Sequence, residues 1–242
     1  MIVNNNAKLM EVFCAYAIKE VLFCNETFVA GDLPQEHIPD IYNIEKTLGI
    51  EVVQLEQACD LDTKYVWAEY EKCDGNYGKI KEFCDEKFPG RYELMEYAGK
   101  LASFSPFVGA HSVDWMSEIN IRNLNNKLKK LNRQNYSGIS GQLFLCASIT
   151  QRARTIYDAL LVLYNLWQAS AQYTARFDKL IVVTSSHVYL FDLNKIREIS
   201  PIKNGKIIYN IQVEGDNYST IYEYDYNKVI RMTKAHFDAQ LV

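Results

Sequence analysis

Several features that would assign a location or a function directly are missing from this sequence of 242 residues. No apolar run reaches the roughly 20 residues that a membrane-spanning helix needs. The first residues, MIVNNNAKLMEVF, lack the basic start, apolar middle and small-residue cleavage site of a secretory signal. We therefore expect a soluble, cytoplasmic protein with no membrane contact.

The cysteines and histidines also lack the patterns of metal-binding or disulfide-stabilised proteins. None of the six cysteines belongs to a C-x-x-C pair, and no histidine lies at ligand spacing. Neither a zinc site nor a disulfide framework is therefore predicted. The sequence contains no G-x-S-x-G, Walker loop, dinucleotide fingerprint or H-E-x-x-H, so the enzyme classes that these motifs define have no support.

The charges are distributed unevenly along the chain. Residues 1–118 carry 21 acids and 10 bases, a net charge of -11, whereas residues 119–242 carry 9 acids and 16 bases, a net charge of +7. Residues 119–157 contain no acid at all. This run is either a solvated helix face or a surface that binds phosphates. Under the second interpretation the residues predicted to bind nucleic acid are Arg122, Lys127, Lys130, Arg133, Arg152 and Arg154.

Hydrophobic periodicity predicts an α/β protein, and an apolar content of 48% is enough for a sizeable core. We expect a mixed central sheet flanked by helices and followed by an antiparallel C-terminal extension. The chain is interpreted as a single domain, 1–242, with a helical insertion at 61–135 and a β-rich tail at 196–242. The expected helices are 7–23, 62–72, 77–88, 115–132 and 150–177; the expected strands are 38–44, 48–56, 142–149, 178–185, 187–193, 207–213, 219–226 and 229–232; and 99–114 is expected to be a loop.

Glu51 is an unusual residue for its surroundings. It lies between Ile50 and Val52 in the apolar run LGIEVVQLE. Burying a carboxylate is costly unless another group compensates its charge. Glu51 therefore either faces an open surface or meets a cation.

A Pro-Asp pair, Pro39 and Asp40, lies on the strand that precedes Glu51 and follows the opening helix. This order resembles the PD-(D/E)xK nuclease superfamily, which includes many restriction and repair endonucleases. The resemblance covers about residues 7–60 and implies a restriction-endonuclease-like core. It also implies that Asp40 and Glu51 hold Mg²⁺ or Mn²⁺, with Glu20 assisting. Hard cations prefer such oxygen ligands, and they activate water for attack on phosphate.

The sequence departs from the family pattern at the position two residues after Glu51, where Val53 replaces the motif lysine. Three explanations are open. A lysine from elsewhere, Lys64 or Lys46, reaches the site; the enzyme works without a lysine, with Glu20 as a further ligand; or the site is inactive and the protein only binds.

The function expected from these observations is that of a metal-dependent endonuclease. Its partner would be nucleic acid, DNA rather than RNA, and a homodimer is left open. The catalytic candidates are Asp40, Glu51, Glu20 and Lys64. The alternative is a catalytically inactive module on the same scaffold that binds nucleic acid or a protein.

Overall fold

The computed structural model describes residues 1–55, 58–87, 92–106, 116, 118–134, 136–149, 155–204 and 206–238. The chain divides into two compact units. We call residues 1–55 with 118–242 the core unit and residues 56–117 the inserted unit, and each is described by itself. The core unit carries 18 acids and 19 bases, whereas the inserted unit carries 12 acids and 7 bases. The inserted unit is therefore acidic, with a net charge of -5, whereas the core unit is close to neutral at +1.

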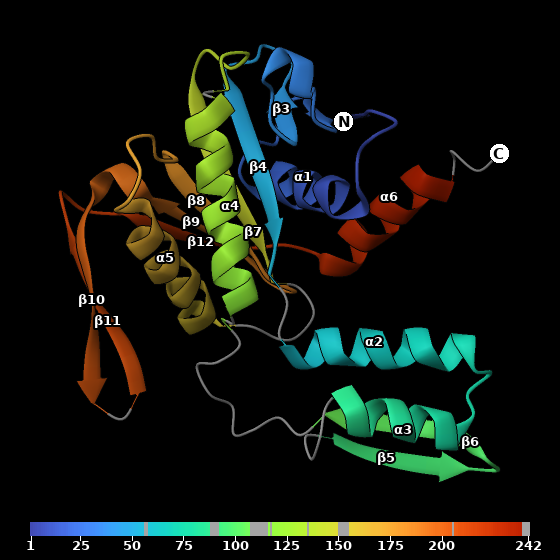
Figure 1. Cartoon of the computed structure of the whole chain (residues 1–242). Coiled ribbons are helices and arrows are strands. Elements are labelled where there is room, and N and C mark those ends of the chain that lie inside the picture. The colour runs from blue at the N-terminus through green and yellow to red at the C-terminus, as the bar shows by residue number, and fades with distance from the viewer. Residues whose placement is uncertain are drawn as a thin grey trace. The chain divides into compact units, whose positions relative to one another are not determined.

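The core unit is built on a mixed sheet of eight strands (Figure 1). Three central strands run parallel, and those on either side are mainly antiparallel. This confirms the predicted α/β class and its mixed central sheet. In the order in which they lie side by side, the strands are β1 (Ile2–Val3), β2 (Phe28–Ala30), β3 (Ile41–Asn43), β4 (Leu48–Gln54), β7 (Gln142–Ser148), β8 (Lys179–Val183), β9 (His187–Asp192) and β12 (Ser219–Glu223).

Helices cover both faces of this sheet. Helix α1 (Leu9–Val21) and helix α6 (Tyr226–Asp238) pack together on the face to which Ile50 and Val52 of β4 point. Helix α4 (Glu118–Gln134) and helix α5 (Ile156–Ser170) follow β4 and β7 and contact the opposite face. Because side chains alternate along a strand, Glu51 points toward α4 while its neighbours enter the core beneath α1.

Smaller elements complete the core unit. Strands β10 (Ile196–Asn204) and β11 (Lys206–Val213) form a separate antiparallel hairpin, which lies beside α5 in Figure 1. The short 3₁₀ helices η1 (Pro34–Glu36) and η3 (Leu193–Lys195) lie in connections. The predicted antiparallel C-terminal extension is confirmed in this hairpin and in the pairing of β12 with β9.

The inserted unit has a small core of its own. Helices α2 (Ala58–Lys72) and α3 (Tyr77–Lys87) pack on a hairpin of β5 (Tyr92–Tyr97) and β6 (Lys100–Pro106). Val66, Ile80, Cys84 and Leu101 form a cluster of buried side chains within it.

Three predictions of secondary structure are corrected. Residues 100–106 of the expected loop form β6, which pairs with β5 across a turn at Ala98 and Gly99; residues 107–114 lie outside the described part. The expected strand 229–232 is part of α6, because Val229 and Thr233 belong to a helical stripe that is visible only over the whole segment. The long helix expected at 150–177 is shorter, since α5 ends at Ser170.

Five of the six cysteines lie in the described part of the chain with their side chains, and these five, Cys14, Cys24, Cys73, Cys84 and Cys146, are free thiols. Within the described part of the chain, no helix is both long and apolar enough to cross a membrane.

Candidate active site

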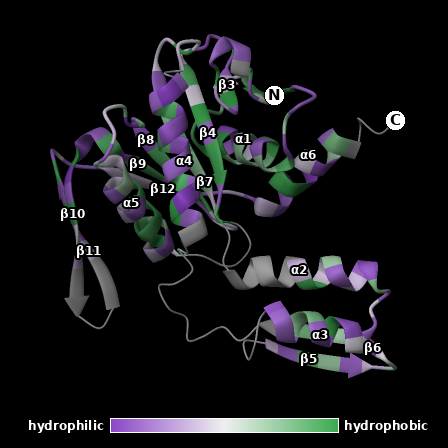
Figure 2. Ribbon diagram, viewed as in Figure 1, coloured by the Kyte–Doolittle hydropathy of each residue, from purple (hydrophilic) through white to green (hydrophobic). Residues whose placement is uncertain are grey.

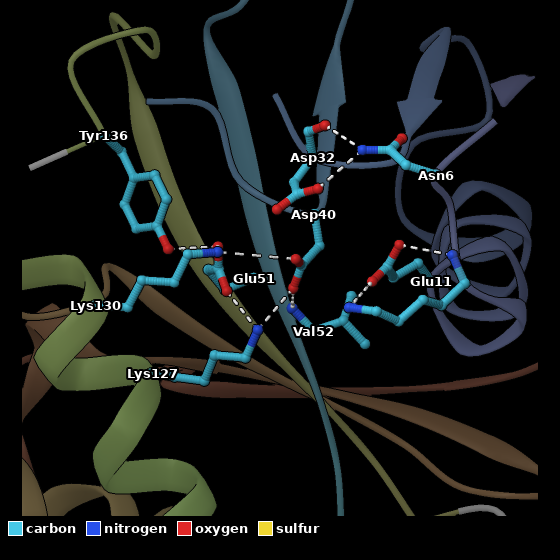
Figure 3. A network of polar contacts seen from close by, with 10 residues as sticks. Asn6, Glu11, Asp32, Asp40, Glu51, Val52, Lys127, Lys130 and Tyr136 are labelled. Carbon is cyan, nitrogen blue, oxygen red and sulfur yellow. Dashed lines mark hydrogen bonds and ion pairs between the residues drawn. The ribbon is translucent and has the colours of Figure 1, made fainter. Parts of the chain in front are cut away.

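Asp40 and Glu51 lie opposite each other on neighbouring strands. Asp40 directly precedes β3, and Glu51 is in the middle of β4. The antiparallel register pairs Ile41 with Ile50, so continuing it by one residue places Asp40 against Glu51. Directly opposed residues project from the same face of a sheet. Figure 3 shows that both carboxylates are turned toward the lysines of α4.

Two lysines of α4 neutralise this carboxylate pair. Lys127 Nζ lies 2.8 Å from Asp40 Oδ2 and 2.5 Å from Glu51 Oε2. Lys130 Nζ lies 2.7 Å from Glu51 Oε1. Residues three positions apart share one side of a helix, so both ammonium groups reach the same strand. We call Asp40, Glu51, Lys127 and Lys130 the carboxylate cluster; its formal charge is zero.

Tyr136, in the turn after α4, completes the hydrogen bonding of Glu51. Its buried hydroxyl donates to Glu51 Oε1, and Lys130 Nζ lies 5.6 Å from the centroid of its ring. Tyr136 has a φ of 33°, in the region that residues with a side chain seldom adopt. An unusual backbone conformation thus accompanies the contact between Tyr136 and Glu51.

Both carboxylates are almost completely removed from solvent. Asp40 is 3% exposed and Glu51 is 0% exposed, whereas the side chains of Lys127 and Lys130 are 21% and 27% exposed. The cost of burying charges is offset only when the charges are paired and hydrogen-bonded. Glu51 accepts three hydrogen bonds, and Asp40 accepts one from the Val52 N–H at 2.8 Å as well as one from Lys127. The ammonium groups of Lys127 and Lys130 therefore compensate the buried charge of Glu51.

The pKa shifts follow from this arrangement. Burial would raise the pKa of Asp40, but the charge and hydrogen bond of Lys127 and the Val52 N–H together lower it. Burial would lower the pKa of Lys127, but the charges of Glu51 and Asp40 raise it. Burial and the neighbouring Glu51 both raise the pKa of Tyr136. At neutral pH, Asp40 is therefore ionised, Lys127 is protonated and Tyr136 keeps its donor proton.

Glu11 is an acid near this site that the sequence reasoning missed. It is buried in the first turn of α1, where it accepts from the Lys8 N–H at 2.9 Å and lies 3.2 Å from Lys8 Nζ. Burial raises the pKa of Glu11; the bond to the Lys8 N–H opposes this shift and the negative charge of Asp40 adds to it. The signal in the sequence was an acid at the third position of the helix, where a side chain can cap the backbone.

The structure does not bring Glu20 to the carboxylate cluster. Glu20 is near the opposite end of α1, about 13 Å along the helix axis from Glu11. Its Oε1 atom lies 2.9 Å from Nζ of Lys228 in α6. The predicted assistance of Glu20 at the metal site therefore has no geometric support.

Of the two lysines first considered, Lys46 is bonded away from the cluster. Lys46 Nζ lies 2.7 Å from Glu36 Oε2 in an exposed pair. Lys64 belongs to α2 of the inserted unit, and its side chain lies outside the described part of the structure. The lysines that do reach the carboxylates are Lys127 and Lys130, which were predicted to contact nucleic-acid phosphates. Their ammonium groups are instead bonded to Asp40 and Glu51.

The remaining bases of α4 face solvent. Figure 2 shows a mostly hydrophilic α4 beside the mostly hydrophobic strands β4 and β7. Arg122 and Arg133 keep the exposure that phosphate binding requires, and Arg152 and Arg154 lie outside the described residues. The exposed bases at helical spacing, which we call the outer basic face of α4, are Arg122, Lys129 and Arg133.

A divalent ion requires a set of suitable ligand atoms around it. Among the residues that the structure describes, no group of three or more His, Cys, Asp or Glu side chains could hold a metal ion. However, Mg²⁺ can bind through one or two carboxylates while it keeps several waters. Lys127 Nζ, a cation, already lies within hydrogen-bond distance of both Asp40 and Glu51. Lys127 therefore occupies the position between the two carboxylates that a divalent ion bound by both would take.

No family model, curated protein or solved structure matches this chain.

Proposed function

We propose that this protein is a metal-dependent nuclease that acts on the phosphodiester bonds of nucleic acid, DNA in preference to RNA, with Asp40 and Glu51 as its metal ligands. The observation that carries the proposal is the position of Lys127 Nζ between the two carboxylates. It marks a point at which groups from two adjacent strands hold one cation. An opening helix, a strand entered through Asp40 and a strand bearing Glu51 are also the features on which the nuclease resemblance rests.

Lys127 supplies the positive charge that β4 lacks. The position two residues after Glu51 is Val53, a buried side chain that cannot replace an ammonium group. An ammonium group near the reacting phosphate can position water and stabilise developing charge. Lys127 projects from α4 to the same carboxylates, so a small withdrawal would leave its charge beside them. Lys130 would continue to neutralise Glu51.

Other groups of the chain hold this arrangement in place. The Val52 N–H fixes Asp40, and the Tyr136 hydroxyl fixes Glu51. A Mg²⁺ ion bound by the two carboxylates would polarise the phosphoryl group and lower the pKa of a water molecule. The outer basic face of α4 would bind the phosphate backbone, because exposed Lys and Arg side chains displace its counterions.

Cleavage assays with defined variants test the proposal. Purified protein is incubated with DNA and with RNA in Mg²⁺ or Mn²⁺. Asp40→Asn and Glu51→Gln are expected to reduce cleavage by at least about 100-fold, the scale of losing one key electrostatic contact. The exposed Lys234→Met serves as the control and should cleave normally. Full cleavage by both acid variants would remove these residues from the mechanism.

A second function, metal-independent binding of nucleic acid on the same scaffold, is favoured by the burial and zero formal charge of the cluster. A permanently closed cluster would need no ion. Calorimetry with Mn²⁺ separates the two functions. Mn²⁺ binding that disappears in Glu51→Gln supports the nuclease, whereas salt-sensitive nucleic-acid binding without any effect of metal supports the binding protein.

A further inference from the structure

The core unit contains a cavity of about 190 Å³ between α4, α5, the segment that precedes β8 and the start of β10. No residue of the carboxylate cluster lines this cavity. Four buried apolar side chains form its wall, and their packing makes that wall rigid. They are Leu128, Leu166, Phe177 and Ile196.

Trp167 and Arg176 form a flat, cationic side of the cavity. Arg176 Cζ lies 5.6 Å from the centroid of the Trp167 ring, which is within the range of a cation–π contact. Arg176 is exposed, and among the described residues no carboxylate lies within ion-pair distance of it. Its charge is therefore available to an anion.

Polar groups lie on the other sides of the same cavity. Arg197 is exposed and pairs with Glu214, an interaction that solvent weakens. The Asn194 side-chain amide donates to Asp178 Oδ1 at 3.2 Å, which leaves its amide oxygen as an acceptor. The Ser170 hydroxyl donates to a backbone carbonyl and keeps its own acceptor capacity. The cavity thus offers cationic donors and neutral acceptors above an apolar wall.

The cavity is attached to the helix that carries the outer basic face. Asn132 of α4 donates through Nδ2 to the Ala175 carbonyl and accepts from the Ala175 N–H, both at 3.0 Å. These two bonds fix the segment that contains Arg176 to α4, near the exposed Lys129 and Arg133. A phosphorylated ligand would meet positive charge both in the cavity and beside it.

We propose that this cavity binds one nucleotide unit, with its base against Trp167 and Arg176 and its phosphate toward the guanidinium groups of Arg176 and Arg197. Bases stack on aromatic rings and on arginine planes, and arginine is well suited to phosphate. The cavity is smaller than the roughly 300–1,000 Å³ of sites for drug-sized ligands. It therefore suits one base and not a longer segment.

The nucleotide unit has two sources, a free mononucleotide or an unpaired base within a nucleic-acid chain. The second source rests on the proposed function and would give the nuclease a preference for substrates with an unpaired base. The first source is independent of cleavage. All binding measurements use the full-length parent protein with divalent metal removed by a chelator, so failure of the nuclease proposal does not affect them.

Binding of adenosine monophosphate is measured first, both by calorimetry and by tryptophan fluorescence. The nucleotide should bind saturably and change the fluorescence, and adenosine or inorganic phosphate should each bind more weakly because only half of the site is used. The Trp167→Ala substitution should weaken binding of adenosine monophosphate at least about fivefold, as expected for the loss of one base stack. Arg176→Met, which alters an exposed side chain and leaves the apolar wall intact, should also weaken binding. Trp67→Ala in the inserted unit is the matched control and should bind normally.

Oligonucleotides then distinguish the sources. A hairpin with one unpaired base is compared with a fully paired duplex of equal length. If the hairpin binds more tightly than the duplex and this advantage is lost in Trp167→Ala, the cavity holds an unpaired base of the substrate. If hairpin and duplex bind equally while the mononucleotide binds saturably, the cavity holds a free nucleotide. No saturable binding of either ligand type, or unchanged binding in both Trp167→Ala and Arg176→Met, would overturn the proposal.

Discussion

Lys127 Nζ lies 2.8 Å from Asp40 Oδ2, although 87 positions separate the two residues in the chain. Asp40 directly precedes β3. Lys127 belongs to α4, which the chain forms after the inserted unit and before β7. The contact therefore forms only when the hairpin and α4 have packed together. Because Lys127 also reaches Glu51, it occupies the place that a metal ion would need, and under the proposed function the two cations would compete.

This competition predicts opposite effects of Lys127→Met on metal binding and on cleavage. Methionine retains much of the apolar stem but removes the charge. The carboxylates then regain a net negative charge, so we expect Mn²⁺ affinity to rise several-fold while cleavage falls at least about 100-fold. Calorimetry and cleavage assays on one preparation measure both effects. Lys234→Met should change neither, and a lower Mn²⁺ affinity in Lys127→Met would contradict the competition.

Tyr136→Phe should destabilise the protein. The substitution removes the hydroxyl that donates to buried Glu51, and hydrogen bonds to charged groups contribute about 1.5–3 kcal/mol. Urea denaturation should show a loss of that size in the free energy of unfolding. Tyr157→Phe changes a side chain that is 61% exposed and should stay within about 0.5 kcal/mol of the parent protein. Equal stability of the two variants would mean that Tyr136 does not support Glu51.

The strands that position the site could be predicted from sequence, because their signals are local. The alternation around Glu51 and the turn before Leu48 are enough to predict the β3–β4 hairpin. Helix α6 was missed because Val229 and Ile230 are β-branched and Met232 is long and apolar, whereas its helical stripe needs a window of about 11 residues to be visible. Packing of this segment against α1 then stabilises the helical conformation.

The partners of Glu51 could not be predicted, because they depend on the rotation of α4 about its own axis. Helical spacing places Lys127 and Lys130 on one side, but it does not say whether that side faces water or the sheet. A run of bases without acids is interpreted as a solvated surface when the acids that pair with those bases lie on strands far away in sequence. The sequence left two alternatives for Glu51, an open surface or a cation, and the structure shows the second in the form of two lysines.

Acid should weaken the fold through Asp40. The pKa of Asp40 is lower in the folded protein than its ordinary value of 3.8, which applies in the unfolded chain. Its stabilising contribution is therefore complete above the unfolded value and is lost as pH falls from about 4 through the folded value. Urea unfolding between pH 6 and 2 should show a shallower loss of stability for Asp40→Asn than for the parent protein. The exposed Asp216→Asn is the control and should follow the parent curve.

The Glu51–Lys130 ion pair should show strong coupling in a double-mutant cycle. Glu51→Gln keeps the shape of the side chain but leaves Lys130 and Lys127 with less negative charge, and Lys130→Met leaves Glu51 with one counterion fewer. Removing one partner of a buried pair costs about 3–5 kcal/mol, mostly because the remaining charge stays buried. The double variant buries fewer uncompensated charges, so its loss of unfolding free energy should be smaller than the sum of the two single losses by about 0.5–3 kcal/mol. Urea denaturation of the four proteins measures this difference. Additive losses would show that the lysine is held by the helix and not by the carboxylate, and Lys130 would then be free to contact a phosphate as the charge pattern first indicated.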